Sequence, residues 1–436
     1  MSIEKINAAR AELHATSAYG TLAAFFDEGS FCETDAFAAS GDGFAEAAAG
    51  YGTVEGLPVY AFAQNTDVCG GALSKAQTAK LKKLYTLAIK TGAPVVGFYD
   101  SVGGRLGQGT ELLAGCGEVL KLASKASGMI PQISVVLGTC LGTNALNASS
   151  ADFVIMTKDA QLSLDVTGTG ASAEENAERG AVCAVEESRE DAIAKARSLL
   201  TYLPSNNLSP APEAENAEPS PEGSCIVSQI ADGGSKLKLS DACGKGARIR
   251  LARLGGAVVG VVRTTGGRMD CAAAAKAAKF VRFCDAFSLP VLTVVDCEGF
   301  ETLGSATKLA SAYAEATTVK LSVVVGKAIG SAYIALAGTG ANADAVYALP
   351  EAVISPVNIE AAAFIMAPEQ MKVPVSEQKA VAERLADEKL SAFNAARNGY
   401  VDGIAELPEL RAALISALDM MAGKRVPTVA KKHSTV

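Results

Sequence analysis

Two glycine-containing turns are the parts of this sequence best suited to chemistry. They are residues 138–145 (GTCLGTNA) and residues 326–333 (GKAIGSAY). Each follows an apolar, β-branched run that predicts a strand and precedes a segment that we expect to be helical. Glycine lets a ligand oxygen approach the peptide N–H groups, and the start of a helix adds N–H groups that lack partners. Because such donors stabilise oxyanions, the two turns predict two oxyanion sites.

Turns of this kind are also ordinary connectors between strands and helices, so a purely structural role is the alternative. Repetition within the chain bears on the choice between an oxyanion site and a connector. Ser134, Gly138 and Gly142 recur 188 residues later, as the following residues: Ser322, Gly326 and Gly330. One such turn alone is better explained as a connector, whereas two matching turns in a duplicated chain fit a paired site as well as they fit two connectors.

A third glycine-dense loop spans residues 100–109 (DSVGGRLGQG). We expect Gly103 and Gly104 to shape a ligand pocket there, with Arg105 near a phosphate or a carboxylate. The alternative is a surface loop with a solvated arginine.

The composition excludes several other kinds of chemistry. The two histidines, His14 and His433, are near opposite ends of the sequence, so neither a histidine-based triad nor a metal site is expected. A net charge of −8 argues against nucleic acid as a partner. The ten cysteines lack zinc-site spacing, and we expect them to be small buried residues in a reducing cytosol.

The elements that position these turns also recur. The sequence predicts a hairpin, a helix and a buried strand ending at an aspartate in each half, which is an α/β pattern. The predicted elements are a helix over 1–30; hairpins over 51–62 and 251–262; helices over 75–91, 109–127 and 272–287; and strands over 95–99, 133–137, 291–295 and 321–325. The lysines of residues 75–90 are predicted to lie on a solvated helix face.

A proline-rich segment separates the two halves. Residues 204–224 hold five prolines among Ser, Asn and Glu, which predicts a linker or a surface strap. We therefore expect domains at residues 1–203 and 225–436. No apolar run is long enough for a membrane span, so we expect a cytoplasmic protein.

The chain resembles the carboxyltransferase family of biotin-dependent acyl-CoA carboxylases and decarboxylases, most closely the propionyl-CoA carboxylase β-subunit type. The resemblance covers nearly the whole chain and rests on a series of segments in order. These segments are 27–31 (DEGSF), 50–53 (GYGT), 90–95 (KTGAPV), 203–207 (LPSNN), 279–287 (KFVRFCDAF), 312–317 (AYAEAT) and 430–433 (AKKH).

The resemblance implies two crotonase-like ββα superhelical domains related by internal duplication. In that family, two subunits pack with the N-terminal half of one against the C-terminal half of the other, often as a trimer of dimers. The N-terminal half holds the acyl-CoA, and the C-terminal half receives biotin from a biotin carboxyl carrier protein. A biotin carboxylase or a membrane decarboxylase subunit is the further partner. No metal is implied.

The resemblance also assigns roles to residues of the turns. Backbone donors Gly142 and Thr143 would polarise the acyl thioester, and Ser331 and Ala332 would hold the ureido oxygen of biotin. Further substrate contacts would come from these residues: Gly103, Gly104, Arg105, Gly138, Gly330, Tyr333 and Ile334. Biotin supplies the base after CO2 leaves, so no histidine is required.

The chain departs from the family at several of these positions. The usual glycine pairs become Gly142-Thr143 and Gly330-Ser331, and an acidic residue often found after Tyr333 is Ile334. The loop after Asp296 is much shorter than usual. The expected function is carboxyl transfer between carboxybiotin and a short acyl-CoA, either as a carboxylase or as part of a decarboxylase complex.

Two further functions stay open at this point. One is a non-catalytic scaffold subunit, which the replaced glycines and the short loop suggest. The other is a hydratase or hydrolase that acts without biotin, with Asp100 or Glu298 as its acidic residue.

Overall fold

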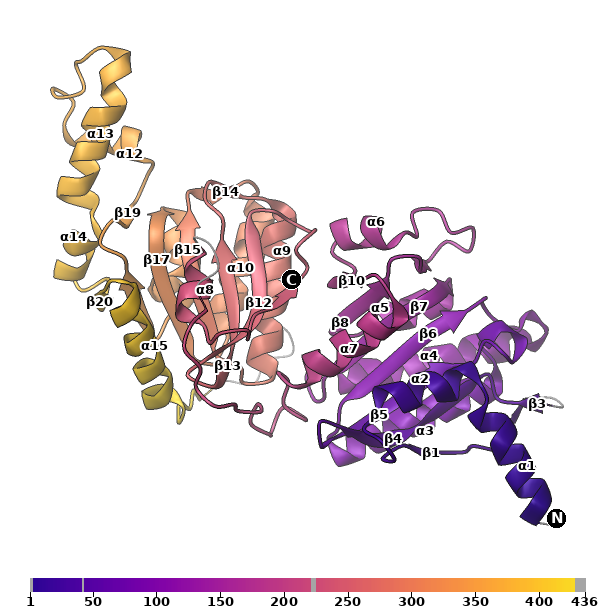
Figure 1. Ribbon diagram of the computed structural model, residues 1–436. Helices are drawn as coiled ribbons and strands as arrows, with labels where there is room; N and C mark the ends of the chain where they lie inside the picture. The colour runs from indigo at the N-terminus through magenta and orange to yellow at the C-terminus, as the bar shows by residue number, and fades with distance from the viewer. Residues whose placement is uncertain (1–2, 41–42, 221–224, 428–436) are drawn as a thin grey trace. The chain divides into compact units, whose positions relative to one another are not determined.

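The chain divides into two compact units, residues 1–212 and 213–436 (Figure 1). The computed structural model describes residues 3–40, 43–220 and 225–427. The boundary falls inside the proline-rich segment that the sequence marks as a linker. Residues 206 and 214 show how that segment is held: Asn206 donates to the carbonyl of Gly92, and the N–H of Ala214 donates to the carbonyl of Gly256. The 430–433 segment and His433 lie outside the described residues.

The first unit is built on one main sheet, which begins with an antiparallel hairpin and continues with parallel strands. The sheet order is β1-β4-β5-β6-β7-β8-β10, with β9 beside β7. The strands are β1 (Cys32–Glu33), β4 (Ala47–Val54), β5 (Leu57–Gln64), β6 (Val95–Ser101), β7 (Gln132–Leu141), β8 (Phe153–Thr157), β9 (Gln161–Ser163) and β10 (Ala184–Glu186), with a separate pair β2 (Ala39–Ser40) and β3 (Gly43–Phe44). The central strands are buried along almost their whole length, as expected for strands covered on both faces.

Helices cover both faces of this sheet. The long helices α3 (Lys75–Thr91) and α4 (Gly109–Ala126) pack together on one face, and α2 (Ser17–Phe25) and α7 (Arg189–Leu200) lie on the other (Figure 1). The remaining helices are α1 (Ile3–His14), α5 (Thr143–Ser149) and α6 (Ala173–Glu178), with short 3-10 turns η1 (Cys69–Gly71) and η2 (Leu106–Gln108).

The second unit repeats this plan. Its sheet order is β11-β12-β13-β15-β17-β18-β20, with β19 beside β17. The strands are β11 (Leu237–Leu239), β12 (Ala247–Leu254), β13 (Ala257–Thr264), β15 (Val291–Cys297), β17 (Lys320–Ile329), β18 (Ala345–Ala348), β19 (Val353–Ser355) and β20 (Gly403–Ile404), with a separate pair β14 (Arg268–Met269) and β16 (Gly299–Phe300). The matching order confirms the duplicated α/β architecture predicted from the sequence.

The helices of the second unit follow the same arrangement, with one addition. The helices are α8 (Ile226–Ile230), α9 (Cys271–Ala286), α10 (Leu303–Glu315), α11 (Ser331–Leu336), α12 (Ile359–Met366), α13 (Val375–Leu390), α14 (Ala392–Arg397) and α15 (Leu407–Met421), with η3 (Thr339–Ala341). Figure 1 shows α12 and α13 projecting from the sheet of this unit. They pack against each other around Leu385 and Ala363, so the projection has a small core of its own.

Each hairpin is fixed by one aspartate, which explains part of the DEGSF segment. The Asp27 carboxylate accepts the N–H groups of Glu55 (3.0 Å) and Gly56 (2.9 Å) at the hairpin turn and pairs with Arg197 (3.0 Å). In the second unit, Asp232 does the same with Gly255 (2.9 Å), Gly256 (2.7 Å) and Arg411 (2.9 Å). Peptide N–H groups are good hydrogen-bond donors to a carboxylate. Through the arginines, these contacts tie the first hairpin to α7 and the second hairpin to α15.

The Asp27 contacts predict a pH dependence of stability. The N–H of Gly56 lowers the pKa of Asp27 most, burial opposes it, and Thr53, Glu55 and Arg197 lower it further, to about 2. The folded pKa is below the ordinary value of 3.8, so the ionised carboxylate stabilises the fold above pH 3.8, and this stabilisation is lost as the pH falls toward 2. We expect Asp27→Asn to lower the unfolding midpoint at pH 7, with the gap to wild type closing between pH 3.8 and about 2. A gap that stays constant in urea titrations across this range would contradict the assignment.

Three sequence predictions need correction. Residues 1–30 form two helices, because Thr16 caps a new helix at Ser17. The Lys80 side chain is buried and pairs with Glu33 at 2.9 Å, so it does not share the solvated helix face with its neighbours. The cysteines are not uniformly buried, since the following three are exposed: Cys32, Cys69 and Cys271.

Candidate active site

The two glycine turns are tighter than the sequence predicts. Strand β7 continues through Leu141 and β17 through Ile329, so a single glycine separates each strand from its helix. That glycine has a positive φ in both units: Gly142 has φ 64° and ψ −132°, and Gly330 has φ 52° and ψ −116°. Side chains are strongly disfavoured in this conformation, which explains why both positions are glycine.

The N–H groups of these two glycines are already used. Gly142 donates to the carbonyl of Ser163 at 2.9 Å, and Gly330 donates to the carbonyl of Ser355 at 2.8 Å. The bonds attach β9 and β19 to the ends of β7 and β17. The sequence predicts Gly142 as a donor to the ligand, but its N–H is bonded within the protein, so Gly142 serves to form the turn. The first N–H group without a partner is that of the next residue.

Thr143 and Ser331 open the helices α5 and α11. The first N–H groups of a helix have no partner within it, and no described residue accepts a hydrogen bond from the backbone N–H of Thr143 or Ser331. Neither residue is among the non-glycine residues with positive φ. The replacement of glycine by Thr143 and Ser331 therefore leaves the backbone donor in place without strain.

Each unit has a second N–H group of this kind. The sequence predicts a substrate contact at Gly104 in the first unit but not at its counterpart in the second. The N–H of Arg105 donates to the carbonyl of Leu73 (2.9 Å), so the preceding N–H, that of Gly104, points to the opposite side of the strand. In the second unit, Glu301 donates to the carbonyl of Met269 (3.0 Å), and the N–H of Phe300 points away in the same manner.

Phe300 could have been found from the repeat. Gly103 and Gly299 are 196 residues apart and have closely similar φ values of 126° and 131°. A Cβ placed on Gly299 would be 3.9 Å from the Ser331 hydroxyl oxygen, so this loop faces the start of α11. Each unit thus brings a strand-end N–H and a helix-start N–H to the same edge of its sheet.

An aspartate braces each of these edges. The Asp100 carboxylate accepts the N–H of Thr139 (3.3 Å), and the Asp296 carboxylate accepts the N–H of Lys327 (3.0 Å). The strand register shifts at both aspartates. Gly138 is required next to this brace, since a Cβ there would be 2.2 Å from an Asp100 oxygen. Gly138 therefore positions the turn, and its contact with a ligand stays a prediction.

Gly138→Ala tests this brace. The added methyl group must displace Asp100, and we expect it to destabilise the first unit by about 1–3 kcal/mol. Gly117→Ala is the matched control, because nothing lies within 4 Å of its Cβ position on α4. Thermal unfolding of the two variants checks the prediction, and equal midpoints would contradict it.

Further side chains hold the first turn of α5 in place. The buried amides of Gln64 and Asn144 form a reciprocal pair, at 3.2 and 3.1 Å, and the Gln64 oxygen also accepts the N–H of Asp100 at 2.9 Å. In the second unit, the Thr264 hydroxyl accepts the N–H of Asp296 at 2.6 Å. These links could not be found from sequence spacing, because Gln64 and Asn144 are far apart along the chain.

Arg105 is engaged by the protein itself. Its Nε is 2.5 Å from the fully buried Glu46 carboxylate, an ion pair whose N–H is not aligned as a hydrogen bond, and its Nη2 is 2.9 Å from the Cys69 sulfur. Ser40 also donates to Glu46, at 2.7 Å. Arg105 thus neutralises Glu46 beneath the glycine loop, and its contact with a ligand phosphate or carboxylate stays a prediction.

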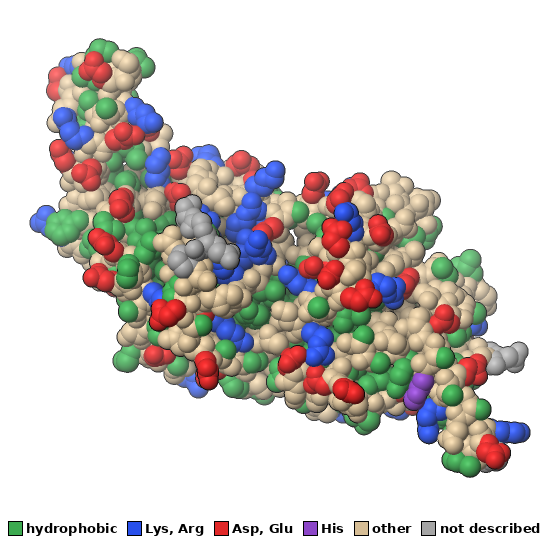
Figure 2. All heavy atoms as spheres, in the orientation of Figure 1, with side chains coloured by type: hydrophobic (Ala, Val, Ile, Leu, Met, Phe, Trp, Pro, Cys, Tyr) green, Lys and Arg blue, Asp and Glu red, His purple; other side chains and the backbone are tan. Residues whose placement is uncertain are grey.

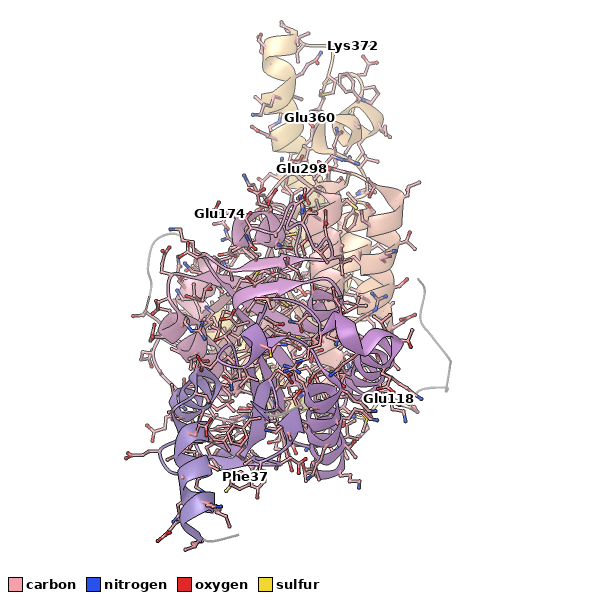
Figure 3. The ribbon with its side chains drawn as sticks, turned by 90° about the vertical axis from the view of Figure 1, so that its right-hand side faces the viewer. Phe37, Glu118, Glu174, Glu298, Glu360 and Lys372 are labelled. Atoms are coloured by element: carbon pink, nitrogen blue, oxygen red, sulfur yellow. The ribbon has the colours of Figure 1, made fainter. Side chains whose placement is uncertain are left out.

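Three further residues considered for the site, Tyr333, Ile334 and Glu298, are at least partly exposed. Tyr333 donates from its hydroxyl to the carbonyl of Tyr400 at 3.0 Å, and burial raises its pKa. Ile334 is 59% exposed. Glu298 pairs with Lys327 at 2.6 Å, and Figure 3 shows it at the end of the unit from which the projection carrying Glu360 and Lys372 rises.

Both acidic residues proposed for a hydratase are in ion pairs with basic side chains. Asp100 braces the turn and pairs with Arg189 at 3.1 Å, and Glu298 is paired as described. Within residues 3–40, 43–220 and 225–427, no group of three or more His, Cys, Asp or Glu side chains could hold a metal ion. None of the helices in those ranges combines the length and apolarity needed to span a bilayer.

Comparison with known proteins decides what this arrangement belongs to. The carboxyl transferase domain matches residues 17–436. The chain belongs to the carboxyl transferase family. It is 32% identical to the methylmalonyl-CoA decarboxylase subunit alpha of Veillonella parvula, over 95% of this chain and 92% of that protein. It is 33% identical to the methylmalonyl-CoA carboxyltransferase 12S subunit of Propionibacterium freudenreichii subsp. shermanii, over 88% of this chain and 82% of that protein.

The fold of this carboxyltransferase matches a solved structure along its whole length. The crystal structure of transcarboxylase 12S, a hexamer with hydrolysed methylmalonyl-coenzyme A bound, superposes with a TM-score of 0.92 and 29% identity, covering 99% of this chain and 98% of that one. The predicted family, the crotonase-like fold and the activity of a biotin-dependent acyl-CoA carboxyltransferase are confirmed.

Proposed function

We propose that the two edges described above form the two oxyanion sites of the transfer reaction. In the first unit, the N–H groups of Gly104 and Thr143 hold the thioester oxygen of the acyl-CoA. In the second, those of Phe300 and Ser331, supported by Ala332, hold the ureido oxygen of biotin. The observation that carries this proposal is that both units leave a matching pair of N–H groups without partners in the described chain, beside a glycine with positive φ.

These donors stabilise the charge that carboxyl transfer creates. When the carboxyl group leaves the α-carbon of the acyl-CoA, an enolate oxygen forms on the thioester, and N–H groups aimed at that oxygen lower the barrier. Biotin would accept the carboxyl group on a ureido nitrogen that gives its proton to the enolate carbon, and the N–H groups of Phe300 and Ser331 would hold its ureido oxygen. No side-chain base is needed, which agrees with the engaged state of Asp100 and Glu298.

The substrate is a malonyl- or methylmalonyl-type CoA thioester, and we propose that it is decarboxylated by passing its carboxyl group to biotin. The names of the relatives support this class of substrate, since both relatives named above act on methylmalonyl-CoA. The short loop after Asp296 supports a carrier that docks differently from those of ordinary carboxylases. A biotin carboxyl carrier protein would supply the biotin, and cytoplasmic localisation stays a prediction.

The site is completed by a second copy of the chain. Apolar side chains rim both turns and are exposed within a single chain: Val102 (73%), Leu164 (68%) and Val166 (75%) in the first unit, and Leu303 (89%), Ile334 and Ile365 (73%) in the second. Exposed apolar clusters of this kind mark interaction surfaces. The hexamer of transcarboxylase 12S supports burial of these rims in an oligomer.

Turnover with free biotin tests the proposal. We expect the purified oligomer to consume methylmalonyl-CoA or malonyl-CoA only when biotin is present. Chromatography measures the shorter acyl-CoA that forms. Crotonyl-CoA is the control substrate, because its consumption without biotin would select the hydratase function. A well-folded oligomer that consumes none of these thioesters, even with a biotinylated carrier domain, would instead support the scaffold function.

A further inference from the structure

We propose that the second unit holds a binding pocket for an organic diphosphate, separate from the oxyanion turns. The pocket is a cleft of about 430 Å³ over β11, β12 and β13, and we call it the basic cleft. Its charged lining consists of Lys236, Lys238, Arg248, Arg250 and Arg263. Figure 2 shows Lys and Arg side chains gathered near the part of this sheet where Figure 1 labels β12.

The strand register forces like charges together in the basic cleft. Arg248 and Arg263 are direct partners across β12 and β13, and Lys238 is the partner of Arg250 across β11 and β12. Directly opposed residues of antiparallel strands lie on the same face with neighbouring side chains. Like charges in that position destabilise a sheet unless an anion offsets them.

The protein supplies little of that compensation. Arg250 forms a two-point ion pair with Asp241, at 2.5 and 3.1 Å. The other four cations have no carboxylate partner among the described residues: Arg248 donates to the Asp241 carbonyl, Lys236 to the Ser228 hydroxyl, and Arg263 to the sulfur of Cys225. The buried Nε of Arg263 has no hydrogen-bond partner in the described chain. The cleft therefore has an excess of donors and positive charge.

The duplicated unit shows that the fold does not require these arginines. The hairpins of the two units have the same register, so Arg248 and Arg263 correspond to Ala48 and Ala63, which are paired across β4 and β5. Both alanines are buried. The same sheet position thus works with a methyl group, and the arginines in the second unit must be explained by something other than packing.

A diphosphate matches the cleft best. Two guanidinium groups side by side can each form paired hydrogen bonds to phosphoryl oxygens, and the two lysines add point charges. The cleft volume lies within the range of small-ligand sites. Nucleoside diphosphates and coenzyme A share this chemistry, so the two sources are separated by experiment.

Calorimetry on the intact oligomer tests the proposal with pyrophosphate, ADP and coenzyme A as probes. We expect pyrophosphate to bind, and Arg248→Ala and Arg263→Ala each to weaken it roughly tenfold or more. Because alanine is the residue of the matching position in the first unit, both variants should fold, with thermal midpoints no lower than that of wild type. Lys379→Ala is the charge-matched control, since Lys379 lies on the exposed surface of α13, and it should bind as wild type.

Alkylation gives an independent readout. Burial raises the pKa of Cys225, but Arg263 and nearby N–H groups bring it below the ordinary value, so its thiol should react readily. Bound pyrophosphate should slow iodoacetamide labelling of Cys225 several-fold and leave exposed Cys32 unaffected, as followed by peptide mass spectrometry.

The outcomes separate the sources. Tighter binding of ADP than of coenzyme A supports a nucleotide, and competition between coenzyme A and pyrophosphate lost in Arg263→Ala supports a second coenzyme A contact. The proposal is overturned if no diphosphate binds, if the arginine variants bind as wild type, or if only an acidic peptide binds. Neither readout uses turnover, so these results are independent of the proposed function.

Discussion

Thr143→Pro and Ser331→Pro should each lower the biotin-dependent turnover of methylmalonyl-CoA by about 10²–10³-fold. Loss of one oxyanion donor costs about 2.7–4 kcal/mol of transition-state stabilisation. Proline removes the N–H that the account assigns to catalysis. It is well tolerated as the first residue of a helix, which is the position of both residues.

Glycine at the same positions is the matched control. Thr143→Gly and Ser331→Gly remove the side chain and keep the N–H, so turnover should stay within a few-fold of wild type. Initial rates over a range of acyl-CoA and biotin concentrations check both sets. If the proline and glycine variants lose activity equally, the side chains matter and the backbone-donor account is wrong.

Arg105→Ala should destabilise the first unit by about 3 kcal/mol, because removal of one partner of a buried ion pair leaves an uncompensated charge. The remaining partner, Glu46, is fully buried, and Ser40 and Ser74 donate to it without supplying a positive charge. Urea denaturation measures the loss.

A double variant separates the effect of lost charge on stability from the effect of lost packing. Glu46→Gln combined with Arg105→Met removes both charges and keeps similar volumes, so the double variant should recover much of the stability lost by Arg105→Ala. A double variant less stable than Arg105→Ala would show that the pair contributes through contacts other than charge. Turnover should follow the stability of the first unit, because Gly103 and Gly104 adjoin Arg105.

Much of the fold could be predicted from local patterns. The hydrophobic period and the placement of glycine and proline predict the hairpins, the long helices and the buried strands that contain Asp100 and Asp296. These signals act over only a few residues. Because the chain is duplicated, each of these elements could be predicted once in each half. The exact turn could not be predicted in this way, because the end of β7 is set by its pairing with β9 through the bond from Gly142 to Ser163.

Part of the proposed site could be predicted from the sequence. The positions of Thr143 and Ser331 follow from the glycine turns, and Phe300 could have been found by carrying Gly104 across the repeat. The roles of Arg105 and Lys80 could not, because each depends on a buried carboxylate from a distant segment. An arginine beside glycines predicts an anion nearby, but the sequence does not show whether that anion is a ligand or the protein itself.

The duplication also acts as an internal comparison for function. The aspartates that fix the hairpins and brace the turns occur in both units and are explained by the fold. Features present in one unit, such as Arg248 and Arg263 opposite each other where the other unit has alanines, call for a separate explanation. This contrast is the reason to look for a ligand in the basic cleft.

The central claim is that main-chain N–H groups of each unit bind the reacting oxygens. A crystal structure of the oligomer with a non-hydrolysable methylmalonyl-CoA analogue tests it most directly. We expect the thioester oxygen to lie about 2.7–3.1 Å from the nitrogens of both Gly104 and Thr143. A thioester oxygen held instead by a side chain, or lying beyond hydrogen-bond distance of both nitrogens, would contradict it.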